Sequence, residues 1–510
     1  MGFLKQQEYI NISAIDLNIK FFRYTYAAIS KKIKNDKLSF IKNFKLNKLI
    51  VCLDNFFYQK GIKENKYSER EILKISKNIN IINLIMTKLF SCNINLFYVH
   101  YFGLIADKIV KEEYDYIGFS VNHSKQFESV TILSKILRDK GYRGKICIGG
   151  SYVYYAKKHL KMNINLFENY VNFAIIGNGE IPTLQLFRYI EGKVKLTDVS
   201  NIIYLDKNKQ FVENNIFDNN INEYVEPNYS GYDFTEYNAV DPVLPIRTST
   251  GCYWGKCTFC NYDKISKYNQ RTVDSVINEI NFLINKYKIN IFYIVDAALS
   301  PSFINEFADK ILEKDLEIYY FTNLRFEDCY TPEFLGKLYK SGLRSVGWGL
   351  ESASPRILKL MNKGIKIETA ERILKNTSFW GIKNHLYYIH KFPSETENDF
   401  KLTYNFIKKN KKYISSVRGH EFYLDKNSYI YNHLEEFGLS LMKIEAIEQK
   451  RIDIPYFTAD ELELTNNNGY YKEFVETISK MFKNNYPTEI ELTISKYKNS
   501  KVSCYSKFKE

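Results

Sequence analysis

The sequence predicts an α/β protein with two successive α/β domains, the second a partial barrel of six strand–helix units. Three observations support this prediction. Short apolar strands alternate with amphipathic helices through most of the chain, a pattern typical of parallel sheets. The chain has 510 residues, too many for one ordinary domain. With 45% hydrophobic and 16% aromatic residues, it is richer in both than disordered chains are, so it can bury a core.

Composition and periodicity divide the chain into five segments. The two α/β segments show the alternation of strands and helices, whereas the segment between them is rich in Asn, Asp and Tyr and weakly periodic. The segments are an unassigned N-terminal stretch at 1–45, the first α/β domain at 46–204, a linker at 205–243, the barrel at 244–434 and a C-terminal extension at 435–510.

The first domain is predicted to contain a parallel sheet, whose ligands would lie at the carboxyl ends of its strands. Val130, Leu133 and Leu137 form a helical stripe that stops at Gly141, a residue suited to end a helix. The predicted strands are Leu49–Leu53, Tyr116–Val121, Lys145–Gly150 and Phe173–Ile176.

The second domain is predicted to repeat strand, loop and helix six times. Helices are expected to begin at Ser300-Pro301, Thr331-Pro332 and Ser354-Pro355, where a polar cap precedes a proline. Six units are too few for a closed eightfold barrel, so an open or partial barrel is expected. One predicted strand enters Cys252, and the others are Ile289–Val295, Ile318–Thr322, Ser345–Gly349, Asn384–His390 and Val417–Leu424.

The net charge of +14 (72 Lys and Arg against 58 Asp and Glu) is spread over many Lys residues. A solvated basic surface and an anionic partner both agree with it. No apolar run approaches the ~20 residues of a membrane span, and the N-terminus lacks an apolar signal region. A cytoplasmic protein without a membrane anchor is therefore expected.

Three cysteines within nine residues give the sharpest chemical signal: Cys252, Cys257 and Cys260. Three thiols on one short loop can converge on one metal centre. Structural zinc normally takes four protein ligands, and no fourth Cys or His lies nearby in sequence. An iron–sulfur cluster held by three thiolates would keep one iron open for a small molecule. A zinc site completed by a distant residue remains the alternative.

This loop resembles the cluster loop of the radical S-adenosylmethionine (SAM) superfamily. Most members have a Cys-x3-Cys-x2-Cys spacing, whereas this chain has Cys-x4-Cys-x2-Cys with Trp254-Gly255 in the longer gap. The resemblance implies that the three cysteines hold a [4Fe–4S] cluster whose fourth iron chelates SAM. It also implies that Phe259 contacts the adenine.

Further matches follow the loop in the family's order. Asp296 ends a strand where relatives carry an acidic residue, and Arg325 lies in an arginine-containing segment. Gly349–Ser354 with Leu360–Gly364 resembles a recurring family segment, and Phe392–Thr396 resembles a recurring turn. By this resemblance Glu351, Ser352, Arg325 and Asp296 are candidate SAM-binding residues.

The resemblance also implies the reaction class. One electron from the cluster cleaves SAM and gives a 5′-deoxyadenosyl radical, which abstracts a hydrogen atom from the substrate. An electron donor such as flavodoxin or ferredoxin is therefore an expected partner. Nothing in the sequence identifies the substrate, and a peptide or a small natural product is expected.

The first domain resembles the Rossmann- or flavodoxin-like cobalamin-binding domain that precedes the barrel in one radical SAM class. Small residues after the strands would let a bulky corrin approach the backbone. The cobalt-ligating Asp-x-His-x-x-Gly motif is absent, and His100-Tyr101-Phe102-Gly103 lacks its Asp. A vestigial, cofactor-free domain is the alternative. The candidate cobalamin-binding residues are Ser120, Asn122, Gly149, Gly150, Gly177, Gly179 and Glu180.

The leading hypothesis is a cobalamin-dependent radical SAM enzyme, which could be a methyltransferase. A cobalamin-free radical SAM enzyme is the second hypothesis. A tRNA methylthiotransferase would need a second cluster, for which Cys52, Cys92 and Cys147 are the available residues, but Cys147 lies in an apolar strand. Nucleic acid is therefore not an expected partner. A non-catalytic iron–sulfur or zinc protein is the last alternative.

Overall fold

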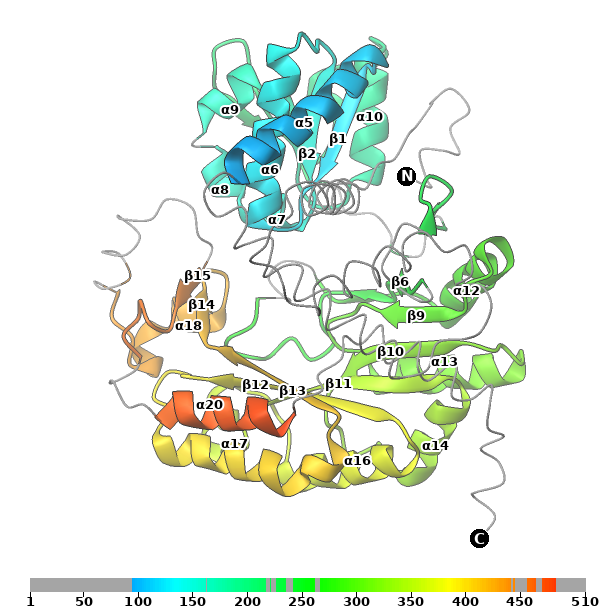
Figure 1. Ribbon diagram of the computed structural model, residues 1–510, viewed down its shortest axis with the longest axis vertical. Helices are drawn as coiled ribbons and strands as arrows, with labels where there is room; N and C mark the ends of the chain where they lie inside the picture. Colours follow the sequence, from blue (N-terminus) through cyan, green and yellow to red (C-terminus); the bar gives the residue numbers. More distant parts are fainter. Residues whose placement is uncertain are drawn as a thin grey trace, which may run out of the picture. The chain divides into compact units, whose positions relative to one another are not determined.

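The computed structural model describes residues 94–161, 163–216, 221, 226–234, 242–261, 267–441, 444, 456–464 and 470–482. The chain forms two compact units, Met1–Asn238 and Ala239–Glu510 (Figure 1). The expected strand Leu49–Leu53 and the segment 1–45 lie outside the described residues. None of the described helices is long and apolar enough to cross a lipid bilayer.

The first unit is built around a five-stranded sheet with the order β1-β2-β3-β4-β5. Strands β1, β2 and β3 are parallel, as predicted, whereas β4 pairs antiparallel with β3 and β5 pairs antiparallel with β4. Its elements are α5 (Ile94–Lys111), β1 (Tyr116–Ser120), α6 (Ser124–Asp139), β2 (Lys145–Gly149), α7 (Ser151–Tyr155), α8 (Lys157–Leu160), α9 (Ile164–Asn169), β3 (Phe173–Ile175), α10 (Glu180–Ile190), a 3-10 turn η2 (Leu196–Asp198), β4 (Ile202–Leu205) and β5 (Phe211–Glu213).

The predicted helix before Gly141 is α6. Leu133 and Leu137 are fully buried in the core of this unit, which explains the stripe. Gly141 follows the helix with a φ of 92°, a conformation that side-chain-bearing residues rarely adopt. The periodicity and the stop signal are both confirmed.

The segment 205–243, predicted as a linker from composition, contains structure. Strand β5 lies inside it and forms an antiparallel pair with β4, and the division between the two units falls after Asn238. The hairpin arises because Leu205 and Phe211 pair across a short polar turn that begins at Asp206, whose carboxylate accepts two backbone N–H groups.

The second unit is built around a six-stranded sheet with the order β13-β12-β11-β10-β9-β6, in which every pair is parallel. This confirms the partial barrel of six strand–helix units. Helices α14, α16 and α17 lie along one side of the sheet (Figure 1). The elements are β6 (Leu244–Ile246), β7 (Ser249–Thr250), β8 (Asn269–Gln270), α12 (Val273–Tyr287), β9 (Ile291–Ile294), α13 (Pro301–Glu313), β10 (Tyr319–Leu324), α14 (Pro332–Lys340), β11 (Leu343–Glu351), α15 (Pro355–Leu360), α16 (Ile367–Phe379), β12 (Lys383–His390), α17 (Glu397–Asn410), η5 (Lys411–Tyr413) and β13 (Ser416–Glu421).

The three predicted helix starts are confirmed. The hydroxyls of Ser300, Thr331 and Ser354 each accept a hydrogen bond from the backbone N–H three residues later. A proline occupies the first helical position each time, where no N–H is needed.

The predicted strand Val417–Leu424 is two strands in two sheets. Strand β13 ends at Glu421, where the N–H of Phe422 donates to the carbonyl of His390, and β14 then pairs with β15. Local periodicity could not predict that β14 pairs with β15, because β15 lies about 30 residues later in the chain. The remaining elements are β14 (Tyr423–Asp425), α18 (Tyr429–Asn432), η6 (Leu434–Phe437), β15 (Tyr456–Thr458) and α20 (Tyr470–Met481).

Candidate active site

The three-cysteine loop lies between β7 and β8, just beyond the carboxyl end of β6. The thiols of Cys252, Cys257 and Cys260 are half-buried and form no disulfide. The N–H of Cys260 donates to the carbonyl of Cys257 at 3.2 Å, which folds the second half of the loop into a tight turn. Within the described ranges, no three His, Cys, Asp or Glu side chains are gathered closely enough to form a metal-binding group. The three thiols lie on one loop, but their side chains are not gathered around a single point in this structure.

Thr258 fixes the loop to distant parts of the second unit. Its N–H donates to the carbonyl of Met361 at 3.0 Å, and its hydroxyl donates to the carbonyl of Leu360 at 2.8 Å. Its own carbonyl accepts from the N–H of Ile430 at 3.1 Å. Backbone and side chain together therefore fix the segment between Cys257 and Cys260.

Asp296 anchors the start of the same loop. Its carboxylate, only 4% exposed at the end of β9, accepts from the N–H of Thr248 at 2.9 Å and from the hydroxyl of Ser249 at 3.0 Å. The hydroxyl of Thr248 is a third donor. Burial raises the pKa of Asp296, and the hydrogen bonds oppose that shift. In this structure the residue holds β6 and β7 to β9, and its predicted contact with SAM stays a prediction.

Arg325 clamps the first half of the loop. Its guanidinium is 3% exposed and lies over the ring of Trp254, 3.9 Å from the ring centroid. Its Nε donates to Glu327 at 3.0 Å, and the same carboxylate oxygen accepts from the hydroxyl of Tyr253 at 2.9 Å. Its Nη2 donates to the carbonyl of Lys363 at 2.6 Å.

Glu351 and Lys363 form a nearly buried ion pair, with Nζ and Oε1 separated by 2.9 Å. Glu351 ends β11 with a φ of 60°, which turns its side chain back toward Lys363. Burial opposes the charge of Lys363, but Glu351 and Cys257 outweigh it and raise the pKa of this ammonium. Lys363 therefore stays charged beside Cys257.

The surroundings of Cys257 fit a thiolate-bound, negatively charged cluster. Burial raises the pKa of the Cys257 thiol, whereas Lys363 and Arg325 oppose that rise. Two buried cations next to one of three free thiols offset the negative charge that thiolates and sulfides would bring. The donor set of three sulfurs fits an iron–sulfur cluster with an open iron better than a closed zinc site.

Trp254, in the longer gap between the first two cysteines, has a partner across the site. Its indole N–H donates to the carbonyl of Asn362 at 3.0 Å. Gly364 lies beneath it with a φ of 69°, and a Cβ there would overlap the Trp254 ring. The cysteine loop thus packs against the segment Leu360–Gly364, which the sequence analysis identified by its resemblance to a recurring family segment.

The side chains of Phe259, in the cysteine loop, and Ser352, just after β11, pack against other parts of the second unit. Phe259 is half-buried against an apolar cluster that includes Ile357, Met361 and Phe392. Ser352 is fully buried, and its hydroxyl is hydrogen-bonded to Thr403 at 3.3 Å and accepts from the N–H of Ser354 at 3.1 Å. The structure brings Arg325 and Glu351 to Cys257 and places Ser352 in the packing that supports α15. The predicted SAM contacts of Phe259 and Ser352 stay predictions.

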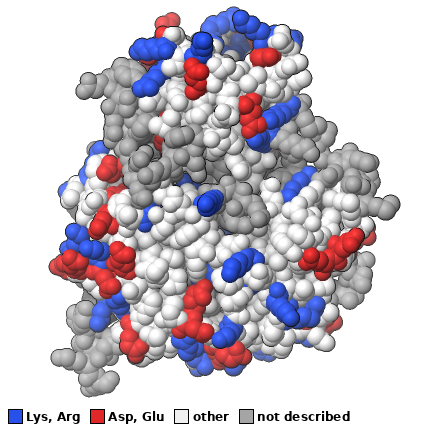
Figure 2. Space-filling model, turned by 180° about the vertical axis from the view of Figure 1, so that it is seen from behind, with Lys and Arg blue, Asp and Glu red and all other residues white. Residues whose placement is uncertain are grey.

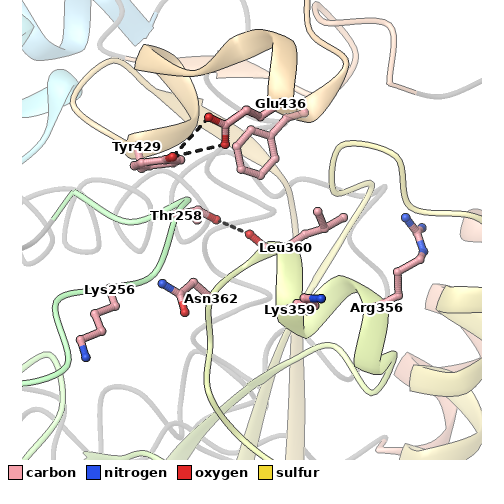
Figure 3. Close-up of a pocket in the computed structure, with 9 residues that line it drawn as sticks. Lys256, Thr258, Arg356, Lys359, Leu360, Asn362, Tyr429 and Glu436 are labelled. Atoms are coloured by element: carbon pink, nitrogen blue, oxygen red, sulfur yellow. Dashed lines mark hydrogen bonds between the residues drawn. The ribbon is translucent and has the colours of Figure 1, made fainter.

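A cavity of about 590 Å³ borders the outer side of the cysteine loop (Figure 3). Lys256 and Thr258 line it from the loop, and Tyr429 and Glu436 line it from the opposite side, joined by a hydrogen bond of 3.2 Å. The other lining residues are Arg356, Lys359, Leu360, Asn362 and Phe437. The loop is thus reached from solvent on this side.

The predicted residues of the first unit lie together at the carboxyl edge of β1, β2 and β3. Asn122 joins two of these strand ends, because its Oδ1 accepts from the N–H and the hydroxyl of Ser151, both at 3.2 Å, and its amide donates to Ser120 at 3.4 Å. Gly149 and Gly150 end β2, and Gly177, Gly179 and Glu180 follow β3.

The glycines of this edge have different roles. Gly150 has a φ of 105°, and a Cβ would lie 2.5 Å from the carbonyl oxygen of Val121, so it allows β1 and β2 to end close together. Gly177 has a φ of 90° and faces open space. One oxygen of Glu180 is buried and accepts no hydrogen bond from the residues that the structure describes. An open backbone beside an unsatisfied acceptor fits a large ligand that carries hydrogen-bond donors, as the amide-bearing cobalamin does.

Several residues of the second unit were missed at the sequence level. Thr248, Thr258 and Lys363 act through hydrogen bonds and an ion pair rather than through a recognisable motif. Their partners lie 48, 102 and 12 residues away in sequence. Only Lys363 had a usable signal, because it lies within the recognised segment Leu360–Gly364.

Residues 246–407 match the family model of the radical SAM superfamily. Over 316 residues the chain is 24% identical to an uncharacterized methyltransferase of Pyrococcus horikoshii, and the alignment covers 60% of this chain and 67% of that protein. It is 28% identical over 178 residues to the bacteriochlorophyllide d C-12(1)-methyltransferase of Chlorobaculum tepidum, covering 33% of this chain and 38% of that protein.

A solved structure shares the fold of this chain. It is the cobalamin-dependent S-adenosylmethionine radical enzyme OxsB with aqua-cobalamin and S-adenosylmethionine bound, with a TM-score of 0.58 and 15% sequence identity. The alignment covers 75% of this chain and 64% of that chain. This chain therefore spans less than two thirds of OxsB and well under half of the second relative.

Proposed function

We propose that this chain is a radical SAM enzyme and, more specifically, a cobalamin-dependent methyltransferase that acts on a peptide or small natural product. The observation that carries the proposal is that two buried cations, Lys363 and Arg325, act on Cys257, which lies on a loop fixed by Thr258. The methyltransferase names of both curated relatives support the reaction type.

In this proposal Cys252, Cys257 and Cys260 hold a [4Fe–4S] cluster, which supplies the electron for reductive cleavage of SAM. Arg325 and Lys363 balance the negative charge of the thiolates. Asp296 holds the start of the loop and Thr258 holds its second half. In this proposal the loop adjusts between these two points so that the three sulfur atoms can bind one cluster. Glu351 has a second carboxylate oxygen available beside Lys363 for the amino group or ribose of SAM.

Cobalamin is assigned to the open edge of the first unit. Gly177 and Gly179 leave the backbone accessible, and Glu180 and Ser120 offer hydrogen-bonding groups. This edge is where parallel α/β sheets usually bind their ligands. The fold shared with OxsB supports the assignment.

A one-electron carrier such as flavodoxin or ferredoxin is the proposed reductant. A reducing compartment such as the cytoplasm is the proposed location, which the absence of disulfides among the described cysteines supports. Nucleic acid is not proposed as a partner. On the face shown in Figure 2, Lys and Arg side chains are interspersed with Asp and Glu side chains and form no continuous basic field.

The test is anaerobic reconstitution of the full chain, followed by addition of SAM, reductant and cobalamin and mass spectrometry of the products. Formation of 5′-deoxyadenosine is expected, together with S-adenosylhomocysteine that depends on cobalamin. Cys257→Ala should reduce SAM cleavage to background, whereas Cys329→Ala should not, because Cys329 is an exposed thiol outside the loop.

The outcomes separate the hypotheses. 5′-Deoxyadenosine without cobalamin-dependent S-adenosylhomocysteine would favour the cobalamin-free enzyme. Full SAM cleavage by Cys257→Ala would contradict the cluster assignment itself.

A further inference from the structure

Strand β13, at one edge of the barrel sheet, has two different faces. Val417 is buried, and a Cβ on Gly419 would overlap the ring of Tyr388, which itself packs against Phe400 of α17. These residues therefore face the helices. Because side chains alternate along a strand, Arg418 and His420 point to the opposite face.

That opposite face is also the face of Glu351. Burial lowers the pKa of His420, and the charge of Arg418 adds to the effect while that of Glu351 opposes it. A Cβ on Gly349 would overlap the side chains of Glu351 and Lys363, and Gly349 is in register with Tyr387 of β12 and, through it, with Arg418 of β13. Arg418 and His420 thus face the side of the sheet that carries the Glu351–Lys363 pair.

Polar side chains from β10, β12 and β13 lie next to one another on this face. Asn323 of β10 is in register with Gly347 of β11, whereas Tyr387 of β12 and Arg418 of β13 are in register with Gly349, two residues further along β11. A Cβ on Gly347 would overlap the Asn323 side chain and lie 2.9 Å from the hydroxyl of Tyr387. Gly347 therefore lets the side chains of Asn323 and Tyr387 approach each other over β11. We name Asn323, Tyr387 and Arg418 the polar row.

Both ends of the polar row have unused hydrogen-bonding capacity. The Oδ1 of Asn323 is buried and accepts no hydrogen bond from any residue that the structure describes. A buried acceptor without a partner lowers stability, so a ligand that donates a hydrogen bond to it is favoured. Arg418 is exposed and forms no ion pair or hydrogen bond in the described part of the chain.

The polar row lies close to the proposed chemistry. Asn323 precedes Arg325 by two residues, about 7 Å along the strand, whereas Tyr387 and Arg418 lie at the level of Gly349, where the side chains of Glu351 and Lys363 also lie. Three strand spacings separate β10 from β13, about 14 Å in total. The row can thus contact a molecule of metabolite size next to the SAM site.

We propose that the polar row binds the substrate, and that the substrate carries an anionic group, carboxylate or phosphate, which pairs with Arg418 while a donor group bonds Asn323. The proposal rests on the proposed function and names the substrate class of that same site. The planar guanidinium suits either anion, since it can donate two parallel hydrogen bonds. A purely cationic or wholly neutral substrate would leave Arg418 without a partner.

The test is protection of Arg418 from phenylglyoxal in the anaerobically reconstituted full chain with SAM. Modification of each arginine is followed by peptide mass spectrometry with inorganic phosphate, with succinate, or with chloride at equal ionic strength. Arg188, an exposed arginine of α10 in the first unit, is the internal control. For a dissociation constant of about 1 mM, about 10 mM anion should slow modification of Arg418 roughly tenfold.

Slower modification of Arg418 alone supports the proposal, with phosphate indicating a phosphoryl group and succinate a carboxylate. Equal effects on Arg418 and Arg188, no protection by either anion, or an Arg418 that no condition modifies would overturn it. SAM cleavage is measured on the same sample. Intact cleavage without protection refutes the polar row alone, whereas protection without any cleavage counts against the proposed function.

Discussion

Gly364 shows how a single residue allows the cysteine loop to pack closely against the segment Leu360–Gly364. The residue has a φ of 69°, and a Cβ there would overlap the indole of Trp254. Trp254 in turn bonds Asn362 and lies against Arg325. An additional methyl group at this position would therefore move the loop between Cys252 and Cys257.

We predict that Gly364→Ala lowers the iron content after reconstitution. Gly438→Ala is the matched control, because Gly438 has a φ of 68° and open space around its Cα. Both variants should lose about 1 kcal/mol of unfolding free energy in urea titrations because alanine is forced into the left-handed region, and Gly364→Ala should lose more because its Cβ also overlaps Trp254. Only Gly364→Ala should lose iron, and equal iron in the two variants would contradict this reasoning.

Lys363 acts on the thiol beside it. Because its charge opposes the rise in the pKa of Cys257, Lys363→Met should raise that pKa further. Iodoacetamide should then alkylate Cys257 of the metal-free protein more slowly at a fixed pH, with Cys329 as the internal standard. Lys366→Met, which removes an exposed lysine three residues away, should leave the rate unchanged. An unchanged rate in Lys363→Met would exclude the electrostatic role.

At this scale the sequence revealed the thiols and little of what surrounds them. Cys252, Cys257 and Cys260 stand out because they are close in sequence. Thr258 bonds partners that are far away in sequence, so no local pattern marks its role, and the only signal for Lys363 was its place in the recognised segment Leu360–Gly364. Arg418 had one signal, because it alternates with Val417 and Gly419 as strand residues do.

At the scale of elements, a buried acid joins the turn after β12 to α20. Glu395 accepts from the N–H of Lys391 at 2.7 Å and from the hydroxyl of Tyr471 at 2.9 Å, both through the same oxygen. The other oxygen is buried and has no partner among the described residues. Burial raises the pKa of Glu395 to about 7.

This shift makes part of the stability depend on pH. The folded protein binds a proton that the unfolded chain has released between about pH 4.5 and 7, so unfolding free energy falls as pH rises through this range. The contribution is complete below pH 4.5 and amounts to at most about 3 kcal/mol. Urea titrations should show a flatter pH profile for Glu395→Gln than for Glu397→Gln, an exposed neighbour in α17. Parallel profiles would refute the assignment.

The elements that could be predicted are those with local signals. The caps at Ser300, Thr331 and Ser354 and the stripe of α6 depend on residues within two turns of each other. Strand β5 and the break between β13 and β14 depend on pairing with other strands. Composition described the region of β5 as a linker because its apolar residues are few and separated by turn residues.

At the scale of the whole molecule, the proposal assigns one cofactor to each compact unit. Each unit has its own hydrophobic core, so loss of one cofactor should not unfold the other site. The alternation of strands and helices along the sequence predicted a parallel sheet in each unit. The two antiparallel strands that extend the first sheet beyond β3 could not be predicted.

We therefore predict a reciprocal pattern in the full chain. Gly177→Val should lower hydroxocobalamin binding, followed by visible absorption, and leave iron content intact, because it adds a side chain to the open edge. Gly192→Val, also at positive φ and in open space in the first unit, is the control for backbone strain. Cys257→Ala should show the reverse, losing iron and keeping cobalamin. Loss of both cofactors in either variant would contradict the assignment of one cofactor to each unit.

The bonds of Thr258 have a consequence for the order of events during synthesis. Two of its partners, Leu360 and Met361, are about 100 residues later in the chain, and Ile430 is about 170 residues later. At roughly 5–20 residues per second, a ribosome needs about 10–30 s to reach Ile430 after Thr258. The three thiols thus leave the ribosome well before the structure that holds them exists. Iron delivery should accordingly be a late step, after Ile430 has left the ribosome.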